Sequence, residues 1–228
     1  MPIAKINVFE EAKNIPQPFL VVDLADIDDF AARLFISEGM VAWHKHVDQE
    51  QLFLVVDGEL ALESEWGNST LQSGEMAVIP KAVIHRCGST LRTIALVFER
   101  KFFASRQNGQ RRMFVLEGAG KIDPVGISAE ALLLTEPSVA VELITVDDLS
   151  LSLVRYEGEA QEHLCSGGSE LLFVQEDKLT LETALGTLTL GTGEMTVVPK
   201  GASYRALAPG KAVVLLATKK TDHRAVRE

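Results

Sequence analysis

The chain has 228 residues, of which 46% are hydrophobic and 24% are charged, so it can build one large core or two small ones. Its formal net charge of −10 at pH 7 argues against general nucleic-acid binding, because so acidic a protein repels a phosphate backbone. It contains no run of 18 apolar residues, so we expect no membrane span.

The ends and the cysteines favour a cytoplasmic protein. The N-terminal sequence MPIAKINVFEEAKN lacks a basic region followed by an apolar run, so we do not expect it to be a secretory signal. Cys87 and Cys165 are too few for a disulfide framework. We therefore expect a cytoplasmic location with reduced thiols.

The predicted elements are mostly strands. Residues 8–14 are expected to form one short helical turn. Short β-rich runs separated by Gly, Asn, Asp and Pro follow: LFLVV (52–56), LALES (60–64), MAVIP (76–80) and TIALVF (93–98). Some runs are apolar on both sides, which favours strands covered on both faces, as in a two-sheet sandwich. Residues 100–112, with five basic residues, are predicted to be a solvated connecting loop rather than an anion site.

The second half of the chain repeats the first. SGEMAVIPKAVIHR (73–86) recurs as TGEMTVVPKGASYR (192–205), an offset of 119 residues (192 less 73). The same offset needs no gap between about residue 20 and about residue 98. We therefore predict a tandem duplication into two all-β barrels, residues 1–112 and residues 113–228.

Three histidines of the first repeat are candidate metal ligands. His44 and His46 project from one face of a strand, because side chains at i and i+2 share a face. Gln51 opens the next strand, and in a jelly-roll barrel His85 comes alongside the first two histidines. Neutral imidazoles suit zinc, copper, iron and nickel, and three histidines with an open position form a known catalytic arrangement. The His-x-His pair alone is weak evidence, since strand histidines often serve packing or solubility.

At the corresponding positions the second repeat carries His163, Cys165, Glu170 and Tyr204. Histidine, cysteine and glutamate can hold a metal in principle, but tyrosine is a poor fourth ligand for most divalent ions. A degenerate barrel kept for packing is favoured over a second metal site or a metal-free ligand pocket.

The histidine pair lies in a motif that resembles the first motif of the cupin superfamily of small β-barrel proteins. That motif reads Gly, a few residues, His-x-His, three or four residues, Glu, six residues, Gly. This chain has Gly39, residues 44–46, Gln51 in place of Glu, and Gly58, with the first spacing one residue short.

The third histidine lies in a stretch similar to the second cupin motif, which reads Gly, five residues, Pro-x-Gly, two residues, His. This chain has Gly74, Pro80, Ala82 in place of Gly, and His85. It looks especially like the small cupins loosely labelled mannose-6-phosphate-isomerase-like. Because the resemblance covers both halves, it implies a bicupin, with two tandem cupin barrels (double-stranded β-helix or jelly-roll).

The resemblance implies a divalent metal ion (Fe, Mn, Zn, Ni or Cu) held by His44, His46 and His85, and by Gln51 if its amide oxygen faces the ion. A neutral glutamine leaves the centre more positive than a glutamate does, which favours a small anionic or enolate-like molecule. Cupins that lack the acidic ligand include cysteine dioxygenase and acetylacetone and gentisate-type dioxygenases. Iron, copper or nickel would suit dioxygenation, and zinc or manganese an isomerase or lyase. Replacing Gln51 with glutamate is expected to tighten metal binding.

The leading hypothesis is therefore a metalloenzyme, and the alternative is a non-catalytic small-molecule binding or sensing protein. A storage or scaffold role is the third. No general base is evident: Glu50 and Glu65 are near the histidines only in sequence, and Glu50 is expected to point away from Gln51. Apolar residues on both faces of residues 51–56 fit burial against the other repeat or another subunit, so we expect a homodimer.

Three smaller features have plain interpretations. Cys87 shares a face with His85 by alternation, but a core residue is favoured over a cavity-lining one. Trp43 and Trp66 are expected to pack near the barrel rim. His223, in a polar tail, is expected to be exposed and without a role.

Overall fold

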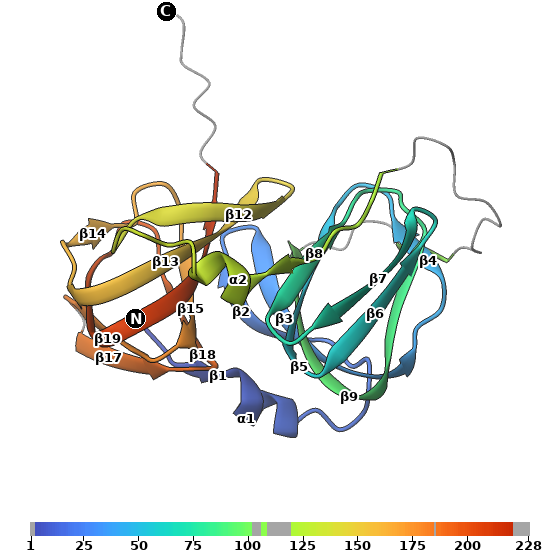
Figure 1. Ribbon diagram of the computed structural model, residues 1–228, viewed down its shortest axis with the longest axis horizontal. Helices are drawn as coiled ribbons and strands as arrows, with labels where there is room; N and C mark the ends of the chain where they lie inside the picture. The colour runs from blue at the N-terminus through green and yellow to red at the C-terminus, as the bar shows by residue number, and fades with distance from the viewer. Residues whose placement is uncertain (1–2, 102–105, 109–119, 185, 221–228) are drawn as a thin grey trace, which may run out of the picture.

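The computed structural model describes residues 3–101, 106–108, 120–184 and 186–220. The chain forms two curled β-sheets that lie side by side (Figure 1), which confirms the predicted all-β fold with two jelly-roll barrels. The first barrel contains β2 (Val22–Ile27), β3 (Phe30–Met40), β4 (His44–His46), β5 (Gln51–Asp57), β6 (Glu59–Ser64), β7 (Gly67–Gln72), β8 (Glu75–Ile79), β9 (His85–Arg100), β10 (Arg106–Asn108) and β11 (Val125–Gly126). The second contains β1 (Ile6–Asn7), β12 (Ala140–Val146), β13 (Leu149–Glu159), β14 (His163–Leu164), β15 (Glu170–Glu176), β16 (Lys178–Thr183), β17 (Gly186–Gly191), β18 (Glu194–Val198) and β19 (Ser203–Lys219).

The connecting region differs in part from the prediction. Residues 106–108, expected to be loop, form strand β10, which pairs antiparallel with β4. The predicted division between residues 112 and 113 lies outside the described residues, as does His223, so the division stays a prediction.

Two short helices complete the described elements. Helix α1 (Val8–Lys13) confirms the expected helical turn, and helix α2 (Ile127–Ala131) is its counterpart in the second repeat. Asn7 caps α1, since its side-chain oxygen accepts hydrogen bonds from the backbone N–H groups of Phe9 and Glu10, both at 3.0 Å. Neither described helix is long and apolar enough to cross a membrane.

The backbone repeats as closely as the sequence does. The described residues with positive φ fall into seven pairs separated by 119 residues: Phe19 and Ser138, Asp28 and Asp147, Gly39 and Gly158, Gly58 and Asp177, Gly67 and Gly186, Gly74 and Gly193, and Ala82 and Gly201. Every left-handed turn of one barrel is therefore present in the other. The duplication is confirmed, and it preserved backbone conformation even where the residue changed.

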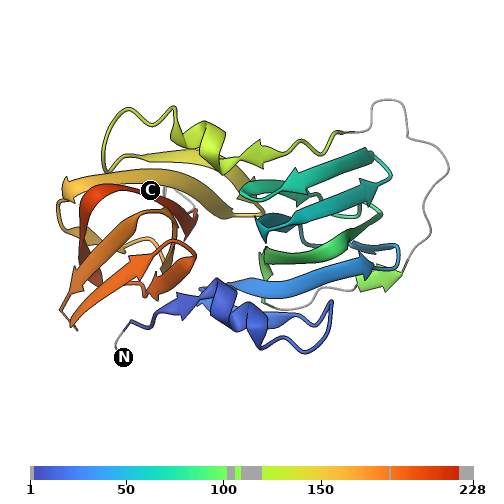
Figure 2. The ribbon, with the colours of Figure 1, turned by 60° about the horizontal axis from the view of Figure 1, so that its bottom comes forward.

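The two repeats exchange their N-terminal arms. Strand β1 pairs with β18 of the second barrel, where Ile6 lies opposite Met195, and β11 pairs with β8 of the first barrel, where Val125 lies opposite Met76. Each arm continues into its helix, and Figure 2 shows α1 and α2 on opposite sides of the junction between the barrels. Each barrel is therefore completed by a strand from the other repeat.

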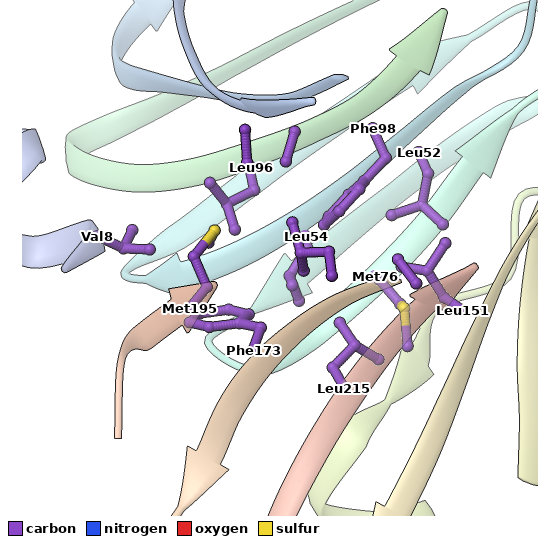
Figure 3. Packing of buried hydrophobic residues seen from close by; sticks show 14 of the residues in the cluster. Val8, Leu52, Leu54, Met76, Leu96, Phe98, Leu151, Phe173, Met195 and Leu215 are labelled. Carbon is purple, nitrogen blue, oxygen red and sulfur yellow. The ribbon is translucent and has the colours of Figure 1, made fainter. Parts of the chain in front are cut away.

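Strand β5 is buried on both faces, as its sequence predicted. Phe53 and Val55 point into the first barrel, whereas Leu52 and Leu54 join a core at the junction that also includes Phe173 of the second barrel (Figure 3). The outer face of β5 is thus covered within the chain, and it does not require another subunit. The homodimer stays a prediction.

Charged residues at the junction follow the same internal symmetry. Arg100 and Lys219 are separated by 119 residues, and so are Asp29 and Asp148; each cation pairs with both carboxylates. The Lys219 Nζ to Asp29 Oδ1 distance is 2.7 Å. These four partly exposed charges, alternating in sign, thus form ion pairs between the two barrels at the junction.

Candidate metal centre in the first barrel

Two adjoining strands bring the three predicted histidines together. His44 and His46 lie on β4, and His85 begins β9 directly opposite His44 in the register of the two strands. Their ring centroids are separated by 5.2 Å (His44 and His46), 4.4 Å (His44 and His85) and 5.9 Å (His46 and His85). One ring nitrogen of each lies within 4.8 Å of those of the others, and the three side chains are buried. This is the convergence that one metal ion needs.

Backbone carbonyl groups fix two of the rings. The Nδ1 atom of His44 is 2.9 Å from the carbonyl oxygen of Ala42, and the Nδ1 atom of His85 is 2.9 Å from that of Val83. A carbonyl only accepts hydrogen bonds, so the proton of each neutral imidazole is on Nδ1. This tautomer makes Nε2 the atom of His44 and His85 that would bind a metal, with the other ring nitrogen held by a backbone carbonyl.

Gln51 faces the same point with its amide oxygen. Its Oε1 atom lies 3.2 Å from Nε2 of His85, while its amide N–H donates to Oε2 of Glu99 at 2.7 Å. This contact joins a ring nitrogen to an acceptor oxygen, and a cation bound by both atoms would satisfy it. Two ligands about 2.0–2.2 Å from one ion and at right angles lie roughly 3 Å apart, so these residues fit a metal ion.

A buried charged group stands behind Gln51, and the sequence analysis missed it. Glu99 accepts hydrogen bonds from Gln51, from Gln49 Nε2 at 3.1 Å and from Arg33 at 2.5 Å. The Arg33 and Glu99 side chains are only 2% and 5% exposed, although both lie in apolar strand sequences. A charged residue within an apolar strand is rarely buried without a partner, so these two residues were the signal in the sequence that could have indicated a buried ion pair.

A small cavity of about 180 Å³ adjoins the centre. His44, His46, Gln51 and Glu99 line its polar end. The rest of the wall is apolar: Phe19, Val21, Phe35, Val41, Phe53, Cys87 and Val97. Its volume is below the roughly 300–1,000 Å³ of sites for drug-sized ligands, so it suits a smaller molecule with an apolar body and a polar end.

The neighbouring acidic and aromatic side chains have structural contacts. Glu50 points to the second barrel, where it accepts a hydrogen bond from the backbone N–H of Asp147 at 2.7 Å. Glu65 accepts one from the backbone N–H of Ile84 at 3.0 Å, just before His85. Trp43 stacks under the Arg86 guanidinium, 4.7 Å from the ring centroid, and Trp66 packs at the edge of the barrel core.

Cys87 was interpreted from the sequence as a core residue or as a residue that lines the cavity. It is buried in the apolar cluster inside the first barrel, and it also lines the cavity. The core interpretation and the cavity interpretation both hold for this residue.

The turn before His85 contains a strained residue. Ala82, whose backbone N–H donates to the His46 carbonyl at 2.6 Å, has φ +62°, whereas its counterpart Gly201 has φ +83°. The left-handed conformation costs an alanine about 1–2 kcal/mol, and a glycine adds about 0.4–1 kcal/mol of unfolded-state entropy. We expect Ala82→Gly to stabilise the first barrel by about 0.5–1 kcal/mol. Urea unfolding of wild type and Ala82→Gly measures this change in the free energy of unfolding.

Gly201→Ala is the matched control for this turn. It should destabilise the second barrel by a similar amount, because it introduces the same strain at the equivalent position. A loss of stability in Ala82→Gly would contradict the explanation by backbone strain.

The equivalent residues of the second barrel form a different cluster. Glu170 accepts a hydrogen bond from His163 Nε2 at 2.8 Å and from the Tyr204 hydroxyl at 3.2 Å. Burial and the Glu170 charge raise the pKa of the Cys165 thiol to about 12, so it is protonated at neutral pH. One ligand atom each of His163, Cys165 and Glu170 lies within 4.8 Å of the others, but the histidine side chain is 51% exposed. The degenerate character of this barrel stays a prediction.

Comparison with known proteins gives one sequence relative among curated proteins, and no protein-family model matches the chain. The relative is the uncharacterized protein YdbB of Bacillus subtilis (strain 168), which is 29% identical over 96 residues. The aligned region covers 42% of this chain and 85% of that protein.

Solved structures match over nearly the whole chain. Salicylate 1,2-dioxygenase from Pseudaminobacter salicylatoxidans has a TM-score of 0.79 at 14% identity, over 96% of this chain and 84% of that chain. A variant of that dioxygenase in complex with gentisate has a TM-score of 0.76 at 13% identity, over 96% and 82%. A cupin 2 conserved barrel domain protein from Leptotrichia buccalis has a TM-score of 0.70 at 12% identity, over 96% and 98%. At these identities the likeness concerns the fold.

Proposed function

Because the chain has the cupin fold in two copies, we propose that its first barrel is a divalent-metal centre that acts on a small anionic, oxygen-bearing molecule. The ligands are His44, His46, His85 and the amide oxygen of Gln51. The observation that carries the proposal is the convergence of three buried imidazoles, whose ligand atoms lie within 4.8 Å of one another, with the Gln51 amide oxygen 3.2 Å from His85 Nε2.

The charge of the site supports an anionic molecule. All four proposed ligands are neutral, and the nearby Glu99 carboxylate is paired with Arg33. When bound, a divalent ion supplies Lewis acidity, and iron or copper also supplies one-electron chemistry. The neutral ligands leave its positive charge largely uncompensated, and an anionic group entering the polar end of the cavity would balance it.

The shape of the cavity supports a dioxygenase-like reaction on a compact molecule. Its apolar wall suits an aromatic ring or a short carbon chain. A structural neighbour that is a dioxygenase in complex with gentisate favours the same class of molecule. Isomerase or lyase chemistry stays the alternative with zinc or manganese.

A non-catalytic binding or sensing role is the second candidate, and one observation favours it. Glu99 is the only carboxylate among the described residues that line the cavity. Its oxygens accept hydrogen bonds from Arg33, Gln49 and Gln51, so it is poorly placed to take a proton from a substrate. A reaction in this barrel therefore needs a substrate that enters already ionised.

Metal analysis and oxygen uptake test these roles together. Protein purified without added metal, or reconstituted with Fe, Mn, Zn, Ni or Cu, should hold about one ion per chain, and His85→Ala should hold far less. Metal-dependent oxygen uptake with hydroxybenzoates, β-diketones or thiols would support the dioxygenase. Binding of one of these compounds without turnover would support the sensing role. Wild-type protein that binds none of the five metals would overturn the metalloenzyme, and wild-type protein that binds neither a metal nor any of these compounds would overturn both.

A further inference from the structure

A buried carboxylate on β9 adjoins the proposed centre, at a position outside both cupin motifs. Glu99 is almost completely buried, and it lies one hydrogen bond behind Gln51, at 2.7 Å. Arg33 on β3 and Gln49 in the turn between β4 and β5 also donate hydrogen bonds to this carboxylate. Its position is therefore fixed from three sides.

An amide has a donor end and an acceptor end, and Glu99 decides which end faces the histidines. The Glu99 carboxylate oxygens accept from Arg33, Gln49 and the Gln51 N–H, and with its N–H turned toward Glu99 the Gln51 oxygen is turned toward His85. We propose that Glu99 is the positioning residue of this centre, because it orients the Gln51 oxygen toward the metal. From behind Gln51 it also supplies the negative charge that an acidic ligand would supply. This inference rests on the proposed metal function.

The second barrel provides an internal comparison. At the offset of 119 residues, Glu170 replaces Gln51 and Thr218 replaces Glu99. The supporting pair is also absent, since Ser152 replaces Arg33 and Gly168 replaces Gln49. Each barrel thus has one carboxylate at this pair of positions. In the first barrel it is Glu99 on β9, and in the second it is Glu170 on β15, the strand equivalent to β5. The residue types at the two positions fit a coupled pair.

This coupling reverses the expected effect of restoring the acid. Gln51→Glu alone removes the N–H that donates to Glu99 at 2.7 Å and leaves two acceptor-only carboxylates facing each other. The side chain at position 51 then has no donor to turn toward Glu99, so its oxygen is no longer held toward His85. We therefore expect Gln51→Glu not to tighten metal binding, in contrast to the expectation from the motif alone.

Four proteins test the inference: wild type, Glu99→Gln, Gln51→Glu, and the double variant that exchanges the two residues. Zn²⁺ and Mn²⁺ affinities are measured by competition with a chromogenic chelator, and stability by urea unfolding. Glu99→Gln should weaken metal binding by about 10–100-fold, the usual effect of removing an outer-shell partner. The exchange should recover the wild-type affinity within about threefold, because a glutamate at position 51 can accept from the amide at position 99.

Stability separates positioning from a purely structural role. Arg33 loses its carboxylate partner in both Glu99→Gln and the double variant, so both should be destabilised alike. Recovery of metal affinity without recovery of stability would mark Glu99 as a positioning residue. An unchanged affinity in Glu99→Gln, or a double variant no better than Glu99→Gln, would overturn the inference.

Gln51→Glu keeps the Arg33–Glu99 pair, so it remains a test if Glu99→Gln does not fold. A tenfold tighter affinity in this variant would also overturn the inference. Wild-type protein that binds neither ion would instead overturn the proposed function, so the two failures are distinct.

Discussion

A His44→Ala variant is expected to lose the metal ion, whereas the matched His163→Ala variant is expected to keep it. The two residues occupy equivalent positions in the two barrels, but His44 is buried beside two other imidazoles and His163 is half exposed beside a carboxylate. Outer-shell changes weaken metal sites by about 10–100-fold, so loss of a direct ligand should weaken this one by more than about 100-fold.

Elemental analysis after dialysis, followed by chelator competition, measures this difference. Near-stoichiometric metal in wild type and His163→Ala, with little in His44→Ala, is the expected pattern. Loss of metal only in His163→Ala would place the ion in the second barrel. Equal metal in all three proteins would contradict a metal centre at the histidine cluster.

Arg33→Met is expected to destabilise the first barrel by about 3–5 kcal/mol, because it leaves the buried Glu99 charge without its partner. The Arg33 side chain is 2% exposed, and its guanidinium contacts Glu99 at 2.5 Å. Its other carboxylate partner, Asp23, is largely exposed, so that ion pair contributes little. A methionine keeps much of the length and apolar contact of the arginine stem, so the loss should reflect the charge and the hydrogen bonds of the guanidinium, which also reach the Arg100 and Lys101 carbonyls.

The double variant Arg33→Met/Glu99→Met is the control for this effect. Removing both charges should recover most of the lost stability, since buried ion pairs replaced by apolar residues are often neutral or better. A loss below about 1 kcal/mol in Arg33→Met, or no recovery in the double variant, would show that the buried pair does not behave as described.

The chain provides separate probes for the two barrels. Both of its tryptophans, Trp43 and Trp66, lie in the first barrel, and both of its tyrosines, Tyr156 and Tyr204, lie in the second. Tryptophan fluorescence during urea unfolding therefore reports on Arg33→Met and Ala82→Gly. Tyrosine absorbance reports on Gly201→Ala.

The features that the sequence predicted are those with local or repeated signals. Strand alternation placed His44 and His46 on one face, and two spaced motifs brought His85 to them. The offset of 119 residues identified the duplication before any coordinate was considered. These signals depend on neighbours in the chain or on self-comparison, so one sequence is enough to read them.

The features that the sequence did not predict depend on pairs far apart in the chain. Arg33 and Glu99 are separated by 66 residues, and nothing near either one indicates its partner. The orientation of Gln51 follows from that pair, so the motif alone and the inferred role of Glu99 give opposite expectations for the effect of Gln51→Glu on metal affinity. The exchanged arms are strands of two residues each, too short to carry a periodic signal.

The exchanged arms also set an order of events during synthesis. The partner of Ile6, Met195 in β18, is made 189 residues after it (195 less 6). At about 5–20 residues per second, the first arm waits roughly 10–40 s on the ribosome before its strand partner exists. Any chain that stops short of β18 leaves β1 without its strand partner, while α1 keeps its contacts with β3 and the hydrogen bond from Arg92 to the Ala12 carbonyl at 2.8 Å. A segment translated late thus completes the packing of one translated early.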